Sequence, residues 1–594
     1  MTPPLDRIAA LLRRRPAALD DPFRPVPGAA PAGAPRDGDA DRRRAGRRLQ
    51  FTAACFCVAF GAVAFKMAAI AATGPAEARV GVVDTGITSD RADIVDRRGN
   101  VLATNVMTTA LYAQPHLMLD PVAAADGLKG IFPDLDQEAW ERRFSSARKF
   151  VWIKGNISPE QRQAVHDLGE PGLLFAEREM RVYPNGPLAA HVLGGARFGE
   201  QDVRAAEIVG VAGTEGFFDE RLAGAPDAPL RLSLDLTVQN TVERVLHSGM
   251  QLMDAKGAAA VLMDIRTGEL IALASLPDFD PNARPRPATE GDPADSPLFN
   301  RAVQGLYELG STFKIFPAAQ ALELGLMNRS TMIDLASPLP KGGTHIRDFH
   351  YLGRERSLED VIVESSNIGT ARVAMQIGSK RQREFLGALG LMEPTGVELT
   401  EARGARPQSP PPNRWSDPYV MTISFGHGLA ASPLHLASAY ASLLGDGRRV
   451  TPTLVARDQA PQLGPEIVSA RTAAESRWML RQVVARGTAS LARIPGYRVG
   501  GKTGTADKPK HTGGYWDDRV VTTFASVLPA DDPKYVLVVT LDEPNDRTGP
   551  KVRRTAGWTA VPVAAEIIRR TMPLLGLRPD EGPEDIGLYS LARR

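Results

Sequence analysis

The sequence has few cysteines and almost no net charge. With only two cysteines among 594 residues, the chain cannot form a disulfide scaffold or a cysteine-based zinc site. The 71 lysines and arginines nearly balance the 69 aspartates and glutamates, so the net charge of +2 gives no case for a nucleic-acid-binding protein. Apolar residues make up 43% and charged residues 24%, which excludes a wholly disordered or collagen-like chain.

Motifs for a cofactor are also missing. The sequence has no glycine-rich phosphate loop and no cluster of residues with metal-ligand spacing. It contains no repeat of the length typical of solenoids. We therefore expect no metal ion and no other cofactor.

One long apolar run, Phe51–Ala72, is interrupted only by one threonine and one lysine. A helix of this length rises about 30 Å, the thickness of a bilayer's hydrocarbon core. The run follows an arginine-rich segment, whereas residues 73–84 carry one arginine and two acids. The positive-inside rule therefore predicts a transmembrane anchor at residues 49–73, with residues 1–48 in the cytoplasm and the rest of the chain outside.

Two alternatives to an uncleaved anchor remain. A cleavable signal peptide is one, because residues Phe51–Phe65 have the length of its apolar region and small residues follow. A buried helix of a soluble domain fits less well, because the run has no polar face. Cys55 and Cys57 both lie in this segment, so the exported part contains no cysteine.

The termini are predicted to be tails. Residues 1–48 carry several prolines among alanine, glycine and arginine, and this composition is typical of a disordered segment. Residues 578–594 form a polar C-terminal tail with glycine and proline.

The exported part divides near residue 230. In residues 74–230 the segment Arg91–Asn105 alternates like two strands around a glycine turn. Residues Ser158–Gly169 predict a helix capped by Ser158, and Gly213–Gly224 predicts a short helix between glycines. None of these segments has a catalytic composition.

Residues 231–577 have a different pattern. Gly257–Phe279 predicts an apolar hairpin and Ser311–Leu326 an apolar helix. Three β-branched runs follow late in the chain, and an amphipathic helix follows them near residues 560–572. Strands at both ends with helices between them predict a mixed α/β domain built on an antiparallel sheet.

The first candidate catalytic motif, Ser311 and Lys314, stands at the start of the apolar helix. Residues three apart lie on one helix face. A serine hydroxyl needs a base, and a lysine shielded from water has a lowered pKa and can be that base. The helix N-terminus adds N–H donors for an oxyanion. Alone the motif is weak, because such a pair is usually a solvated helix face, as at Ser146 and Lys149.

The second motif, Ser365 and Asn367, is flanked by apolar residues, as in a turn between buried helices. The hydroxyl can relay a proton to a leaving amine, and the amide can hold Lys314 or a substrate carbonyl. The alternative is a helix N-cap, for which serine and asparagine are well suited.

The third motif is Lys502-Thr503-Gly504-Thr505, which follows two glycines. On a strand, Lys502 and Gly504 face one way and the two threonines the other. The glycine would let a substrate backbone approach the strand edge, and the lysine and a threonine would bind a carboxylate. The alternative is a glycine turn.

The order of the motifs decides between these interpretations. Ser-x-x-Lys, Ser-x-Asn 54 residues after Ser311, and Lys-Thr-Gly 135 residues after Asn367 form the motif set of penicillin-binding proteins and class A β-lactamases. The chain resembles class B penicillin-binding proteins of the division-specific (FtsI) type over nearly its whole length after the tail. The resemblance rests on YELGSTFK (Tyr307–Lys314), SSNIGTARVA (Ser365–Ala374), SFGHGLAASPLHLASAY (Ser424–Tyr440), GKTGTA (Gly501–Ala506), DRRGNVLA (Asp96–Ala103) and GTEG (Gly213–Gly216).

The resemblance implies an α+β (mixed α/β) fold. A penicillin-binding transpeptidase domain at residues 231–577, an antiparallel sheet flanked by helices, would follow an extended β-rich pedestal or dimerisation-type domain at residues 74–230. No segment resembles the glycosyltransferase domain of class A members. Ser366 departs from the family pattern, since many relatives carry aspartate there.

The resemblance also implies the reaction, D,D-transpeptidation of peptidoglycan stem peptides. Ser311 would attack the carbonyl between two D-alanines, and Lys314 would take its proton. Ser365 would pass a proton to the departing D-alanine, and Asn367 would orient the donor. The terminal carboxylate would bind Lys502 and Thr503, on the strand that carries Gly504 and Thr505. The N–H groups of Ser311 and Thr505 would form the oxyanion hole, and β-lactams would acylate Ser311.

By the same resemblance, the chain would lie in the bacterial inner membrane with its catalytic domain in the periplasm. Its partners would be a SEDS-type glycosyltransferase and other division proteins, and it would build the septal wall. Glu308 favours the division type over an elongation-type transpeptidase, which remains an alternative. A D,D-carboxypeptidase or β-lactamase-like hydrolase and a non-catalytic scaffold are the others. A secreted hydrolase would not need the long region before the catalytic domain.

Overall fold

The computed structural model describes residues 91–579, except positions 203–204, 337, 343, 460, 463 and 511, and a helical stretch within residues 51–67. The chain forms two units, residues 1–85 and 86–594. The predicted anchor at residues 49–73 lies only partly within the described residues; residues 53–64 are helical and exposed. Among the described residues, no helix has both the length and the apolar character needed to cross a bilayer.

The first part of the second unit is built on a five-stranded sheet in which β2 (Val101–Ala113) pairs with three other strands. β1 (Ile94–Val95) meets β2 across the expected glycine turn, with Ile94 opposite Ala103. The remaining strands are β3 (Val151–Ile157), β4 (Leu173–Val182) and β7 (Leu230–Arg231), and a separate hairpin consists of β5 (Gly195–Asp202) and β6 (Ala205–Ala212).

Helices α3 (Pro121–Ile131), α4 (Gln137–Phe144) and α5 (Pro159–His166) share a small core with this sheet. The Ser158 hydroxyl accepts a hydrogen bond from the Gln161 N–H, while the Gln161 side chain accepts one from the Ser158 N–H. This capping box begins α5 where the sequence predicted. The expected single helix at Gly213–Gly224 is in fact two short helices, α7 (Gly213–Phe217) and α8 (Asp219–Gly224).

The second part contains a five-stranded sheet in which each strand is antiparallel to its neighbours. Its order is β16 (Gly500–Pro509), β17 (Tyr515–Leu528), β18 (Tyr535–Asp542), β8 (Gly257–Asp264) and β9 (Leu270–Leu276). The expected hairpin is confirmed as β8 and β9. Strands distant in sequence therefore lie side by side, and β16 forms one edge of the sheet.

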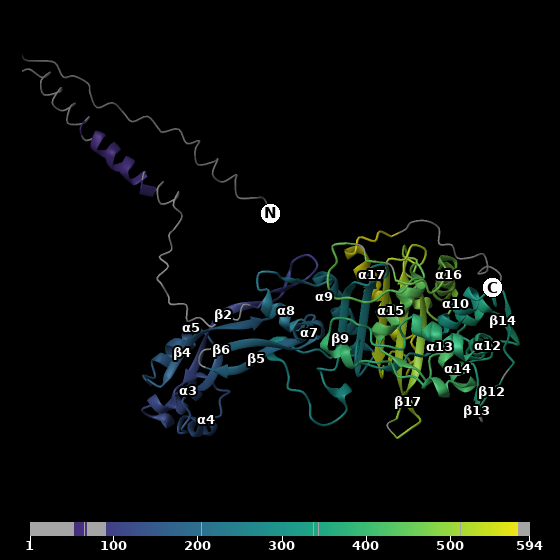
Figure 1. The fold of residues 1–594 in the computed structure, drawn as a ribbon, viewed down its shortest axis with the longest axis horizontal. Helices are drawn as coiled ribbons and strands as arrows, with labels where there is room; N and C mark the ends of the chain where they lie inside the picture. The colour runs from purple at the N-terminus through teal and green to yellow at the C-terminus, as the bar shows by residue number, and fades with distance from the viewer. Residues whose placement is uncertain are drawn as a thin grey trace, which may run out of the picture. The chain divides into compact units, whose positions relative to one another are not determined.

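Helices cover both faces of this sheet, which is why nearly every position of β8, β9 and β18 is buried. α9 (Leu236–Leu252) and α17 (Ala560–Leu574) pack together on one face, and α15 (Pro433–Leu444) packs on the other (Figure 1). The antiparallel sheet between helices confirms the expected mixed α/β architecture.

A helical region lies beside β16 and carries two of the three motifs (Figure 1). Its longer elements are α10 (Ile315–Glu323), α11 (Leu358–Val363), α12 (Asn367–Ile377), α13 (Ser379–Ala388), α14 (Asp417–Ser424) and α16 (Ala470–Arg486). The 3-10 helix η4 (Gly310–Lys314) leads into α10 and packs on β16. Short strand pairs are β10 (Tyr307–Glu308) with β15 (Ala430–Ala431), β11 (Met332–Asp334) with β14 (Glu355–Ser357), and β12 (Leu339–Lys341) with β13 (Thr344–Ile346).

Candidate active site

Ser311 and Lys314 lie in η4, whereas the sequence had predicted that Ser311 starts an α-helix. The α-helix α10 begins one turn later, at Ile315. In a 3-10 helix, side chains three apart are eclipsed, so both residues of the motif point the same way. The 3-10 helix therefore aligns the directions of the two side chains better than the predicted α-helix would.

Three glycines allow η4 to lie against its neighbours. Gly310 has a φ of 56°, in the left-handed region that glycine adopts without strain. A Cβ at Gly426 would lie 2.0 Å from the Gly310 carbonyl oxygen, and one at Gly504 would lie 2.2 Å from the Leu309 carbonyl oxygen. The backbones before Ser311 and along β16 therefore touch directly.

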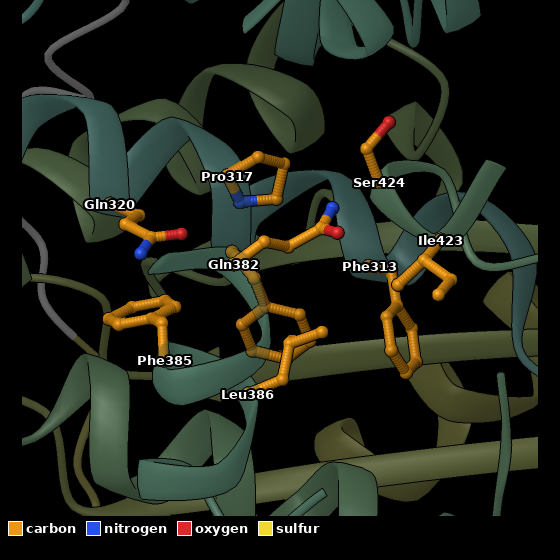
Figure 2. Close-up of a pocket in the computed structure, with 9 residues that line it drawn as sticks. Phe313, Pro317, Gln320, Gln382, Phe385, Leu386, Ile423 and Ser424 are labelled. Carbon is orange, nitrogen blue, oxygen red and sulfur yellow. The ribbon is translucent and has the colours of Figure 1, made fainter. Parts of the chain in front are cut away.

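The other side of η4 is held by buried groups. The Tyr440 hydroxyl donates a 2.7 Å hydrogen bond to the Thr312 carbonyl oxygen. Figure 2 shows Phe313 and Pro317 facing Gln382 and Leu386 of α13 across a small gap. Gln382 is itself fixed, because it donates to the Val420 carbonyl oxygen and accepts from the Trp415 indole N–H. These contacts fix η4 and the start of α10 in place.

Two lysines converge on one hydroxyl. Lys314 Nζ donates to Ser365 Oγ at 3.0 Å, and Lys502 Nζ donates to the same atom at 2.9 Å. Lys314 also donates to the Ser365 carbonyl oxygen. Ser365 lies in the turn between α11 and α12 with a φ of 63°, unusual for a residue with a side chain. The expected turn between buried helices is confirmed.

Both lysines are buried, and burial disfavours their charged forms. Burial lowers the pKa of Lys314 far below its ordinary range, and the nearby charge of Lys502 lowers it further, while Asp348 opposes the shift. Burial lowers the pKa of Lys502 to about 7. Burial and the neighbouring charge thus both favour the neutral form of Lys314, which is the form able to accept a proton.

Asp348 organises the start of α12. Its carboxylate accepts hydrogen bonds from the Ser366 hydroxyl and from the Asn367 and Ile368 N–H groups, at 2.8, 2.5 and 3.1 Å. The Ser366 hydroxyl also accepts from the Gly369 N–H as the N-cap. The cap that the sequence offered as an alternative function is thus present at Ser366, next to Ser365. Sequence reasoning did not find Asp348, which has no motif around it.

The Asn367 side chain donates to the Arg347 carbonyl oxygen at 3.0 Å. The sequence suggested that this amide holds Lys314 or a substrate carbonyl. In this structure it instead ties α12 to the segment that carries Asp348, while still lining the cleft described below.

β16 carries the third motif along the sheet edge. Thr503 Oγ1 lies 2.7 Å from Thr488 Oγ1, and Thr505 Oγ1 accepts a hydrogen bond from the Ala556 N–H at 3.0 Å. The face of Gly504 is occupied by Leu309 and Thr312. The close approach that this glycine permits is therefore that of η4, rather than the substrate backbone that the sequence suggested.

A cleft of about 590 Å³ joins the three motifs. It is lined by six of the eight predicted site residues, Ser311, Lys314, Ser365, Asn367, Thr503 and Thr505. Lys502 reaches it through Ser365, and Gly504 lies beneath η4. The described residues contain no group of ligands that could hold a metal ion. The cleft thus combines a hydroxyl, a shielded amine and a sheet edge, which is the chemistry of acyl transfer.

Comparison with known protein families identifies both domains of the chain. The penicillin binding protein transpeptidase domain matches residues 258–569, and the penicillin-binding protein dimerisation domain matches residues 86–229. The chain belongs to the class B penicillin-binding protein family. The resemblance stated from the motifs is confirmed, as is the expected serine-type transpeptidase class.

Two relatives named as peptidoglycan D,D-transpeptidases and one solved structure of a penicillin binding protein are similar to this chain. The chain is 35% identical to the probable peptidoglycan D,D-transpeptidase FtsI of Caulobacter vibrioides, over 83% of this chain and 82% of the relative. It is 28% identical to the peptidoglycan D,D-transpeptidase FtsI of Escherichia coli, over 83% and 85%. The crystal structure of penicillin binding protein 3 from Mycobacterium tuberculosis, complexed with aztreonam, matches with 27% identity and a TM-score of 0.61, covering 83% and 97% of the two chains.

Proposed function

We propose that this penicillin-binding protein cross-links peptidoglycan stem peptides in the septal wall through an acyl-enzyme on Ser311. The observation that carries the assignment is the convergence of Lys314 and Lys502 on Ser365 Oγ, in a cleft that Ser311 also lines. One cationic and one neutral amine around a shared hydroxyl provide both a base and a proton relay.

The donor peptide binds along the β16 edge. Its terminal carboxylate pairs with Lys502 and the Thr503 hydroxyl, and Asn367 orients its backbone. The carbonyl between the two D-alanines points its oxygen at the N–H groups of Ser311 and Thr505. Such donors stabilise the negative charge that develops on the oxygen.

Acylation begins when neutral Lys314 takes the proton of the Ser311 hydroxyl. Oγ bonds to the carbonyl carbon, and the tetrahedral intermediate places its charge in the oxyanion hole. The C–N bond then breaks. The proton passes from Lys314 through Ser365 Oγ to the departing amine, which leaves as D-alanine, and Ser365 is positioned for this relay by its contact with both lysines.

An amine of a second stem peptide completes the reaction. It attacks the Ser311 ester, forms the new amide bond and releases the Ser311 hydroxyl, with Lys314 again exchanging the proton. A β-lactam follows the same first step, but its opened ring stays attached, so the acyl-enzyme persists.

We also propose the membrane arrangement that the sequence predicts. Residues 49–73 anchor the chain in the inner membrane, residues 1–48 lie in the cytoplasm, and the domains at residues 74–230 and 231–577 lie in the periplasm, with residues 578–594 as a tail. The apolar run Phe51–Ala72 and the arginines before it support this. A SEDS-type glycosyltransferase and other division proteins are the proposed partners. Retention of the chain in membranes after alkaline washing tests the anchor.

The transfer itself can be tested with a D-alanyl-D-thiolactate donor and a D-amino acid as amine acceptor, using the full-length chain. The proposal predicts that the amide product exceeds the hydrolysed product, and that the Ser311→Ala variant forms neither. Predominant hydrolysis would favour the carboxypeptidase alternative. Depletion in cells separates the two transpeptidase types, because filaments indicate loss of septal synthesis and rounded cells indicate loss of elongation.

A further inference from the structure

A second groove, separate from the catalytic cleft, lies between α9 and α17. It has a volume of about 230 Å³ and shares no lining residue with the cleft. The two helices meet closely at Gly249, where a Cβ would lie 2.6 Å from Val563 Cγ2. Leu252, the last residue of α9, lines this groove and is 62% exposed. A large apolar side chain exposed in a groove favours a ligand that covers it.

The rim of this groove is positively charged. Arg244 is exposed and has no ion-pair partner among the residues that the structure describes. Arg570 also lines the groove, and its Nε donates to the Glu566 carboxylate at 2.6 Å. The neighbouring Arg569 pairs with the same carboxylate. Three arginines therefore surround one carboxylate, so the rim favours a ligand with negative charge.

The charged and apolar parts of the groove lie at different ends. Gly249 of α9 lies against Val563 of α17. Arg244, earlier in α9, and Arg570, later in α17, line the same groove, so the two helices run antiparallel here. The arginines thus lie toward the end of α17, and Leu252 lies toward its start. A chain that returns along the groove from the end of α17 meets the arginines first and the apolar part second.

The segment that follows α17 carries matching properties in the same order. Residues 580–594 come directly after the last described residue. Four of their first six positions are acidic, namely Asp580, Glu581, Glu584 and Asp585. Apolar side chains come next, at Ile586, Leu588, Tyr589 and Leu591, before Arg593 and Arg594. The acids complement the arginines of the rim, and the apolar residues complement the part of the groove beyond them.

This segment is long enough to reach the groove. α17 rises about 16 Å from Val563 to its last residue, Leu574. The seven residues from 579 to 586 span about 23 Å when they are extended. The acids can therefore stand beside the arginines while the apolar side chains that follow them cover Leu252.

We propose that residues 580–594 dock in the groove between α9 and α17, with their acids beside the rim arginines and their apolar side chains against Leu252 and Val563. The docked segment shields an apolar surface from water and from other proteins. This inference goes beyond the proposed function and does not depend on it, because no residue of the groove lines the catalytic cleft.

The test uses the full-length chain with the photoreactive amino acid p-benzoylphenylalanine in place of Leu252. After irradiation, peptide mass spectrometry identifies the residue to which the probe has attached. We expect attachment to residues 586–594 of the same molecule. The probe in place of Leu119, which is 80% exposed in the first part of the chain, is the matched control and should not attach to this segment.

Charge changes test the contact with the rim. Arg244→Glu should slow the attachment by up to about fivefold, because it replaces an attraction by a repulsion. Glu584→Lys should also slow it. The two changes together should slow it less than their separate effects predict, because they form a new pair of opposite charges. Cooperative thermal unfolding shows that each variant is folded.

Three results would overturn the inference. These are no attachment to residues 580–594 in a folded chain, attachment only within a cross-linked dimer, which would make a second copy the occupant, and an unchanged rate in Arg244→Glu. Reaction with benzylpenicillin reports separately on Ser311. A chain that reacts with benzylpenicillin but gives one of these three results loses the inference and keeps the proposed function.

Discussion

Lys314 and Lys502 approach Ser365 Oγ from two elements that are far apart in the sequence, at 3.0 and 2.9 Å. Two ammonium groups this close in a buried site cannot both keep their protons at low cost. Burial and the charge of Lys502 both favour the neutral form of Lys314, and burial lowers the pKa of Lys502 to about 7.

Replacing Lys314 by methionine should remove the base and keep the fold. Methionine has a similar length and no amine to desolvate, so we expect acylation by benzylpenicillin to fall by about 100-fold to 10,000-fold with an unchanged or higher melting temperature. Stopped-flow acylation and thermal unfolding measure the two effects. Lys380→Met, at an exposed position of α13, is the control. Near-normal acylation by Lys314→Met would exclude Lys314 as the base.

The pH profile of acylation should have a falling limb near pH 7. The second-order rate constant reports the free enzyme, which needs Lys314 neutral and Lys502 charged. Because burial holds the pKa of Lys502 at about 7, a rise in pH through 7 removes the charge that binds the carboxylate. Deprotonation of Lys314, whose pKa is lowered by burial and by the charge of Lys502, should produce a rising limb.

The Lys502→Arg variant tests the origin of that limb. A guanidinium stays protonated throughout this range, so the falling limb should disappear even if the maximal rate is lower. The profile is measured with benzylpenicillin between about pH 5 and 9, a range that brackets the Lys502 pKa of about 7. An unchanged limb in Lys502→Arg would mean that another group causes it.

Gly504→Ala should displace the nucleophile segment. The added Cβ would lie 2.2 Å from the Leu309 carbonyl oxygen, a backbone atom that cannot rotate away. We expect a loss of about 1–3 kcal/mol in the free energy of unfolding and at least a 100-fold slower acylation. Gly404→Ala, with no atom within 4 Å of the new Cβ, is the control. Normal kinetics for Gly504→Ala would show that η4 does not depend on this contact.

Asp348→Ala should loosen the turn that holds Ser365. It removes the acceptor of the Ser366 hydroxyl and of two N–H groups at the start of α12. We expect about 1–3 kcal/mol of destabilisation and acylation slowed by about tenfold to 100-fold. Asp334→Ala, which removes an exposed ion pair with Arg372 and a hydrogen bond from the Ala336 N–H, provides the comparison. Equal effects of the two substitutions would argue against a positioning role for Asp348.

The candidate site residues could be proposed from the sequence because their motifs are short and local. Ser311 and Lys314, Ser365 and Asn367, and Lys502 to Thr505 are each close together in the chain. Short sequence patterns were therefore enough to propose them, although a single pattern alone was weak. The strand alternation, the β8–β9 hairpin and the α5 cap follow from equally local patterns. Their assembly into one cleft came from the family resemblance rather than from the patterns themselves.

The remaining features depend on contacts that no local pattern records. Asp348 reaches α12 from a loop, and only tertiary structure places it there. Gly504 was interpreted from its own strand, although the atoms it accommodates belong to η4. Ser311 lies in a 3-10 helix whose first residue, Gly310, packs against Gly426, a contact that the residues around Ser311 do not reveal.

The most direct measurement for the central claim is the intact mass of the full-length chain after incubation with benzylpenicillin, alongside Ser311→Ala. We predict one stable adduct on the wild type, with the mass of the whole antibiotic, and none on the variant. No adduct on a folded wild type, or an adduct that persists in Ser311→Ala, would contradict the account.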